Sequence, residues 1–289
     1  MKLWPFGKKS ESEAQSRSTP NPPEPEISAM DRLLSKNCSR DEFFLLYLKL
    51  IEERIQGATI EMLNDSTVQV RRPSGKELTV FMENAWIAYS GTPDGRRELL
   101  ERYAAGMAAD PVEGVEKERV VAMIKDSEYM SDFKPEHKPA AEHLRGDLWV
   151  IYSQDFPDRN VSLRLDRLEE VGIPISEARS LALDNLRRML PDAQRHGDGP
   201  WFLLTAGGDY TASLLLFDQM WDELGASVEG DLVAVVPSRD VLLYTGSNSV
   251  QGLAAIRERA AKILATGNYL VSDTLIVRRD RKWEVFKAN

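Results

Sequence analysis

Cysteine is nearly absent from this sequence, and long apolar runs are missing altogether. Cys38 is the only cysteine among 289 residues, so no disulfide can form within the chain, which fits a reducing compartment. No apolar run approaches the ~18–20 residues that span a bilayer. The basic start, Met1–Lys9, is followed by polar residues rather than by the apolar segment of a secretory signal. We therefore expect a cytoplasmic protein without a transmembrane segment.

Positive charge is scarce over most of the chain. The formal net charge is −9, and residues 31–230 hold 24 basic and 36 acidic side chains. Affinity for nucleic acids comes largely from Lys and Arg that neutralise phosphates, so this surface repels a phosphate backbone. The composition, 42% hydrophobic and 29% charged, is typical of a globular protein with a sizeable core. The excess of negative charge argues against nucleic acid as the main partner, and a protein or a small molecule remains open as the partner.

The strong catalytic and cofactor motifs are also missing. The sequence has no GxxxxGK[ST], GxGxxG, HExxH, CxxC or GxSxG pattern. Glu136–His143 holds two carboxylates and two imidazoles, but Pro139 interrupts it and no closing ligand is visible, so we expect no metal. His196 lies in a glycine-containing loop, and Cys38 lies just before a helix cap without a basic partner. The sequence thus predicts no catalytic residue and no cofactor.

Composition divides the chain into an arm and two folded units. Residues 10–29 are rich in Pro, Ser and Glu and cannot bury enough apolar surface to offset the loss of backbone entropy. We expect a disordered arm over residues 1–38, an N-terminal α+β unit over 39–130 and a C-terminal α+β unit over 131–289. Composition alone does not distinguish two domains from two parts of one domain.

Apolar periodicity and turn signals predict the elements of the first unit. A capping-box pattern, Ser39 followed by Glu42, opens a helix that Gly57 ends. The predicted strands are TIEML, TVQV and ELTVF, and the further predicted helices span residues 95–109 and 115–126.

A polar stretch, residues 127–145, leads into the second unit. Its predicted strands are DLWVIYSQD and WFLLTA, followed near the end by a hairpin of TLIVR and WEVF. Its predicted helices span residues 176–190 and 249–266, with a further apolar helical stripe of Leu214, Phe217, Trp221 and Leu224 that we expect to pack in the core. Strands lie next to strands and helices next to helices, so the predicted fold class is α+β, with antiparallel sheets and packed helices.

A polar interruption between two apolar runs gives the only candidate site. In Val233–Gly246, VAVVPSRDVLLYTG, the residues Pro-Ser-Arg-Asp favour a turn between two buried strands. A plain turn predicts that Arg239→Ala changes stability by less than ~0.5 kcal/mol, whereas a buried charge pair predicts roughly 3–5 kcal/mol. If the strand ends converge, the candidate ligand-binding residues are Asp209, Tyr210, Ser238, Arg239, Asp240 and Arg278.

The last third of the chain resembles a known family. GDYTAS at 208–213, GDLVAVVPSRDVLLYTG at 230–246 and DTLIVRRDRKWEVF at 273–286 are similar, in order and spacing, to the YtpQ-like proteins, domain-of-unknown-function family 1444. The resemblance covers residues 39–288 in outline and is most specific over 200–288. It implies a bacterial, cytosolic protein of mixed α and β structure, and it brings no activity, substrate or catalytic residue.

Two functions follow from these observations. The first is a non-catalytic binding or regulatory module, favoured by the missing catalytic motifs. The alternative is a hydrolase or a small-ligand-binding enzyme with its site near Asp209, residues 238–240 and Arg278. The enzyme requires these side chains to converge in one pocket.

Overall fold

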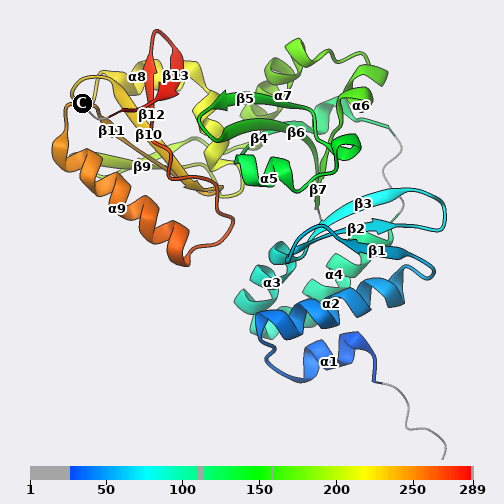
Figure 1. Ribbon diagram of the computed structural model, residues 1–289. Helices are drawn as coiled ribbons and strands as arrows, with labels where there is room; N and C mark the ends of the chain where they lie inside the picture. Colours follow the sequence, from blue (N-terminus) through cyan, green and yellow to red (C-terminus); the bar gives the residue numbers. More distant parts are fainter. Residues whose placement is uncertain (1–26, 110–113, 158, 288–289) are drawn as a thin grey trace, which may run out of the picture.

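The fold consists of three antiparallel sheets that follow one another along the chain, with helices packed against them (Figure 1). The computed structural model describes residues 27–109, 114–157 and 159–287. The predicted α+β class is confirmed, since every strand pairing in this part of the chain is antiparallel. No helix in the described ranges is both long and apolar enough to cross a membrane.

The N-terminal part contains a three-stranded sheet of order β1-β2-β3 and a group of helices. Its elements are α1 (Ala29–Ser35), α2 (Arg40–Arg54), β1 (Thr59–Met62), β2 (Thr67–Arg71), β3 (Glu77–Phe81), α3 (Met82–Gly91) and α4 (Arg96–Ala108). The capping box predicted from Ser39 and Glu42 is present at the start of α2. Local sequence signals therefore set the beginning of this helix.

The predicted disordered arm, residues 1–38, was wrong over its last part. Residues 29–35 form α1, where the Ser28 side chain accepts a hydrogen bond from the Asp31 backbone. Leu33 is fully buried in the same apolar cluster as Phe43 of α2, so α1 is fixed by tertiary packing that composition does not reveal. The prediction for residues 10–29 falls largely on residues 1–26, which lie outside the described residues.

The middle sheet has the order β4-β6-β5, with β7 paired to β6. Its strands and the helices beside it are β4 (Val120–Lys125), α5 (Ser127–Ser131), β5 (Ala141–Arg145), β6 (Leu148–Phe156), β7 (Arg159–Ser162), α6 (Leu165–Glu170) and α7 (Ile175–Met189). The helix predicted over residues 115–126 was wrong, because its second half is β4. Residues 120–124 are buried on both faces of the sheet, and such a short apolar run carries no helical or extended period.

The last sheet has the order β13-β12-β10-β11-β9-β8. Its strands and helices are β8 (Gln194–His196), β9 (Trp201–Thr205), α8 (Asp218–Gly225), β10 (Leu232–Ser238), β11 (Val241–Gly246), α9 (Val250–Thr266), β12 (Ile276–Arg279) and β13 (Lys282–Val285). The predicted terminal hairpin is confirmed as β12 and β13. Part of the predicted helical stripe was wrong. Leu214 lies in a 3₁₀ helix, Thr211–Leu216, and only Trp221 and Leu224 of the stripe lie in α8.

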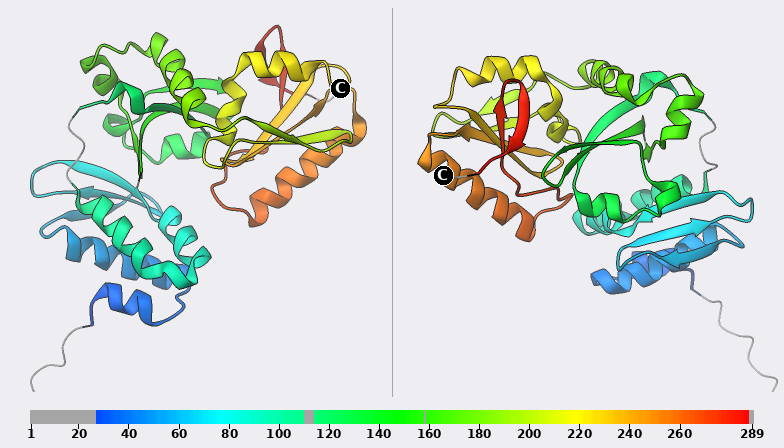
Figure 2. Two further views of the ribbon diagram at one scale, coloured as in Figure 1. Left: turned by 180° about the vertical axis from the view of Figure 1, so that it is seen from behind. Right: turned by 45° about the horizontal axis from the view of Figure 1, so that its top comes forward.

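The apolar run of β10 is explained by burial on both faces. Val233 and Val235 pack under α9, whereas Ala234 and Val236 face the larger core that also contains Trp221 of α8. Figure 2 shows α9 lying along one side of this sheet in two further views. Both faces of the strand thus require apolar side chains, and polar residues are confined to its end.

The apolar residues of the described chain form separate clusters. One cluster contains only residues from 29 to 107, while the largest contains residues from 120 to 283. Figures 1 and 2 show the N-terminal sheet and its helices lying beside the middle sheet rather than merged with it. A cleft lies where these two parts meet.

Candidate functional site

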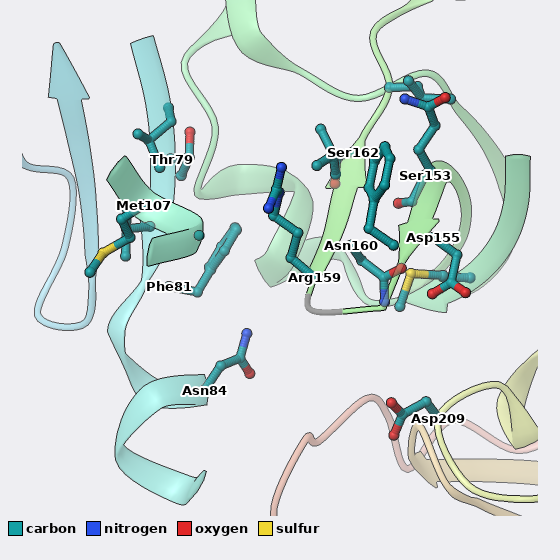
Figure 3. A pocket seen from close by; sticks show the side chains of 18 of the residues that line it. Thr79, Phe81, Asn84, Met107, Ser153, Asp155, Arg159, Asn160, Ser162 and Asp209 are labelled. Atoms are coloured by element: carbon teal, nitrogen blue, oxygen red, sulfur yellow. The ribbon is translucent and has the colours of Figure 1, made fainter. Parts of the chain in front are cut away.

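A cleft of about 1600 Å³ lies between the N-terminal part and the two later sheets, and we call it the central cleft (Figure 3). Thr79, Phe81 and Asn84 line it from the N-terminal side. The side chains of the middle sheet face them, and Asp209 lies at the edge formed by the last sheet. The cleft is thus built from three segments that are far apart in sequence.

Arg239 lies in this cleft and is held from three directions. Its Nη2 lies 3.0 Å from Oδ1 of Asp209, and its guanidinium carbon lies 3.4 Å from the centroid of the Tyr269 ring. Its backbone N–H donates to the Tyr269 carbonyl at 3.0 Å. The side chain is 23% exposed, so Arg239 is not the solvent-facing residue of a plain turn. Its charge is instead fixed in place at the wall of the cleft.

Ser238 and Asp240 form the turn that the sequence predicted between β10 and β11. The buried Ser238 hydroxyl donates to Oδ1 of Asp240 at 2.6 Å. The pairing of the two strands shifts register between Val235 and Ser238, which accommodates Pro237 inside the strand. Among the described residues, the three histidine rings contact Glu77, the Gly146 carbonyl and Thr205, and none of them contacts Ser238.

Tyr210 joins the last sheet to the middle sheet at the base of the cleft. Its hydroxyl donates to Oδ1 of Asp155 at 2.6 Å and lies 2.9 Å from Oδ1 of Asn160. Burial raises the pKa of the Tyr210 hydroxyl, and the bond to Asp155 adds to this effect. Tyr210 therefore stays protonated and positions the loop that carries Asp209.

Arg278 does not join the other candidate residues. It pairs across the sheet with Leu232, at the start of β10, whereas Arg239 follows the end of that strand. Its guanidinium bonds to Asp218 at 3.1 Å and to Asp222 at 2.8 Å, both on α8. Arg278 thus has a structural role in attaching α8 to the sheet, away from the central cleft.

Lys125 is a cleft residue that sequence reasoning missed. It ends β4, on the sheet face that looks into the cleft, and its Nζ lies 4.8 Å from the centroid of the Tyr129 ring. Burial, with a smaller contribution from the nearby charge of Arg239, lowers the pKa of Lys125 to about 8. The face of the Tyr129 ring favours the charged ammonium form of Lys125, but the combined effect of burial and Arg239 on the pKa is larger. Because residues 115–126 were predicted to be a helix, the sequence did not place Lys125 at the end of a strand.

The cleft-facing side of the middle sheet is polar. Ser153 on β6 and Ser162 on β7 are direct cross-strand partners, so their side chains share one face. The Ser162 hydroxyl lies 3.2 Å from that of Tyr129. The Ser153 hydroxyl is buried and has no hydrogen-bond partner among the described residues. An unpaired buried hydroxyl in a cleft wall is available to a bound molecule.

The N-terminal part faces this wall with aromatic and amide groups. Tyr103 on α4 and Tyr269 both line the cleft. Burial raises the pKa of the Tyr103 hydroxyl, and Tyr269 adds a smaller effect in the same direction. Phe81 stacks on Tyr129 with ring centroids 5.0 Å apart. Asn64 also donates to Asp132 at 2.7 Å. The contacts of Phe81 with Tyr129 and of Asn64 with Asp132 join the N-terminal part to the middle sheet.

The histidine-containing segment does not assemble a metal site. Nε2 of His137 lies 2.6 Å from Oε2 of Glu77, on the N-terminal sheet, while Nε2 of His143 lies 2.8 Å from the Gly146 carbonyl. Within the described ranges no cluster of three or more His, Cys, Asp or Glu side chains is suited to hold a metal. Cys38 is buried, with Sγ 4.0 Å from the Lys36 carbonyl.

The chain is similar to UPF0354 proteins of Bacillus-like bacteria. It is 20% identical over 247 residues to one from Oceanobacillus iheyensis, which covers 82% of this chain and 92% of the relative. It is 24% identical over 176 residues to one from Halalkalibacterium halodurans, 59% of this chain and 66% of the relative. A third, from Bacillus cytotoxicus, is 28% identical over 133 residues, 44% of this chain and 49% of the relative.

No family model matches the chain, and no solved structure matches it significantly. The names of the three relatives specify no ligand, reaction or partner.

Proposed function

We propose that this protein is a binding module that takes up a small organic anion in the central cleft. The observation that carries the proposal is the charge of the cleft. Eight Lys and Arg residues line it against four Asp and Glu residues, although the whole chain has a formal net charge of −9. A cleft that concentrates the opposite charge to the rest of its chain attracts and retains anions.

Arg239 is the residue best placed to contact such a ligand. Asp209 engages one terminal nitrogen of its guanidinium, and Tyr269 stacks against the plane. A guanidinium fixed in this way is preorganised and loses little side-chain entropy when a carboxylate or phosphate binds to its remaining N–H groups. Because Asp209 is 60% exposed, the ion pair itself remains accessible to a ligand.

The size and the walls of the cleft favour a small molecule over a macromolecule. The volume of about 1600 Å³ exceeds the ~300–1,000 Å³ of ordinary ligand pockets, which leaves room for water or for closure of the cleft. The walls come mainly from two parts of the chain whose apolar clusters are separate, residues 29–107 and residues 120–283. We therefore propose two units that bind the ligand between them, with the aromatic contact of Phe81 and Tyr129 at the fixed side.

The similarity to UPF0354 proteins and the residues 200–288 support a further assignment, to the YtpQ-like family. With it we propose a bacterial, cytoplasmic protein. A small molecule or another protein is its partner rather than nucleic acid, since residues 31–230 hold more acidic than basic side chains.

Calorimetric titration tests the proposal with pyrophosphate and citrate as anionic probes and glucose as the neutral probe. We expect one site for an anion and none for glucose. Arg239→Ala should weaken the binding of the anion by roughly 10- to 100-fold, the loss of a charge-assisted contact. Arg187 is the matched control, because it also pairs with an aspartate, Asp184, and lies over a ring, Phe217, outside the central cleft.

Arg187→Ala should leave the affinity unchanged. Absence of anion binding, or equal losses in the two variants, contradicts the proposal. Sodium chloride must be held at one concentration, because ionic strength screens these contacts.

A further inference from the structure

Lys125 is a half-buried lysine at the wall of the central cleft. It lies at the end of β4 opposite Trp149 of β6, with its cleft-facing amine beside the Tyr129 ring. Its amine forms no ion pair or hydrogen bond with the residues that the structure describes. Lysines of proteins are usually exposed and solvated, so a half-buried amine at a cleft wall without a carboxylate partner is unusual.

The charges that face Lys125 come from three neighbouring segments. Arg239 approaches from the turn between β10 and β11, Asp209 from the loop after β9, and Asp126 from the start of α5. Burial has the largest effect on the amine and lowers its pKa to about 8, and Arg239 acts in the same direction against the two carboxylates. Asp126 is occupied as the helix cap that accepts from the Tyr129 backbone at 2.8 Å. A substantial fraction of the Lys125 amine is therefore neutral near pH 8, and a neutral amine is a nucleophile.

We propose that Lys125 captures the carbonyl group of the bound anion as an imine, so that the ligand class is an aldehyde or ketone that also carries a carboxylate or phosphate. This inference rests on the proposed function, because Arg239 holds the anionic group while the amine reacts. The cleft thus offers a fixed guanidinium and an amine that has no carboxylate partner among the described residues, and these match two groups on one small molecule.

The chemical step is balanced without a further reactant. The lone pair of Nζ forms a bond to the carbonyl carbon, the carbonyl π electrons move to oxygen, and one N–H proton is transferred to that oxygen. The resulting carbinolamine loses its hydroxyl group together with the second N–H proton as water, leaving a C=N bond. No group is oxidised or reduced, and hydrolysis reverses the step. The anionic group of the ligand offsets the positive charge of the protonated imine.

Reductive trapping tests the inference on the full chain. Glyoxylate, the simplest anionic aldehyde, is incubated with the protein and cyanoborohydride at pH 8, and the modified lysine is located by peptide mass mapping. Since neutral amine is about a hundred times more abundant at a pKa of 8 than at 10.5, we expect Lys125 to react on the order of tenfold or more faster than exposed lysines such as Lys262. Propionaldehyde, which has no anionic group, should show a smaller preference for Lys125.

Lys125→Arg should abolish the rapid adduct, and Lys262→Arg should leave it unchanged. A second measurement uses only the unsubstituted protein. Its labelling rate at Lys125 should level off above about pH 8. Labelling of Lys125 no faster than that of Lys262, or a labelling rate at Lys125 that keeps rising up to pH 10, overturns the inference. If pyrophosphate still binds in that case, the imine is refuted and the anion site stands; if pyrophosphate binding is also absent, the proposed function has failed.

Discussion

Arg239→Ala measures how the guanidinium is held at the wall of the cleft. The ion pair with Asp209 involves a 60% exposed carboxylate, and such pairs contribute about 0.2–1 kcal/mol. Stacking on Tyr269 at 3.4 Å adds about 0.5–1 kcal/mol. The backbone bonds of residue 239 survive the substitution. We therefore expect a loss of about 1–2 kcal/mol in the free energy of unfolding, more than a plain turn gives and less than a buried pair.

Urea denaturation of a double-mutant cycle separates the two contributions. Asp209→Asn should cost less than about 1 kcal/mol, and the coupling energy between Arg239 and Asp209 should be about 0.2–1 kcal/mol. Arg187→Ala, an exposed pair with Asp184, should cost under about 0.5 kcal/mol. A loss of 3 kcal/mol or more for Arg239→Ala would reveal an uncompensated buried charge, and a loss below about 0.5 kcal/mol would mean that neither contact stabilises the fold. Either result refutes the reasoning.

Two further predictions concern residues of the same cleft. Burial depresses the pKa of Lys125 from 10.5 to about 8, so the charged amine destabilises the folded state. The destabilisation is complete below pH 8, where it reaches up to about 3 kcal/mol. It disappears as the pH rises toward 10.5, because the unfolded chain then loses the same proton. Lys125→Met should therefore have a larger free energy of unfolding than the unsubstituted protein at pH 7, and this gain should shrink by pH 10. Urea midpoints of the two proteins that differ equally at both pH values would contradict this. Tyr210→Phe removes the hydroxyl that donates to Asp155 and should cost about 1.5–3 kcal/mol in chemical denaturation, because the acceptor is charged. Tyr47 is the control, because it is buried and its hydroxyl has no hydrogen-bond partner among the described residues. Tyr47→Phe should cost under about 0.5 kcal/mol. Equal losses in Tyr210→Phe and Tyr47→Phe would show that the bond to Asp155 contributes nothing.

The parts of the fold that were predicted correctly are those with local signals. The capping box of Ser39 and Glu42 fixed the start of α2, and the terminal hairpin turns at Asp280 and Arg281, both at positive φ. The helix predicted over residues 115–126 failed because β4 is buried on both faces, which removes the alternation that identifies a strand. That error also hid Lys125, whose side chain reaches the cleft only because β4 is extended.

The candidate site was predicted in part for a similar reason. Turn chemistry in the sequence placed Arg239 and Asp240 at a strand end, and the structure brings Arg239 to Asp209. Arg278 was included on the assumption that all strand ends meet, but antiparallel pairing puts it beside Leu232, some ~20 Å along β10 from the turn. The opposite wall, with Phe81 and Tyr103, comes from a part of the chain that no local pattern connects with the turn.

The position of a bound anion tests the central claim most directly. Crystals of the protein soaked in tungstate, a divalent anion with strong anomalous scattering, locate the site without assuming a ligand. The proposed function predicts an anomalous peak in the central cleft, within hydrogen-bond distance of the Arg239 guanidinium and on the side of Lys125. Peaks confined to the outer surface, with an empty cleft at a tungstate concentration that occupies those outer positions, would contradict it.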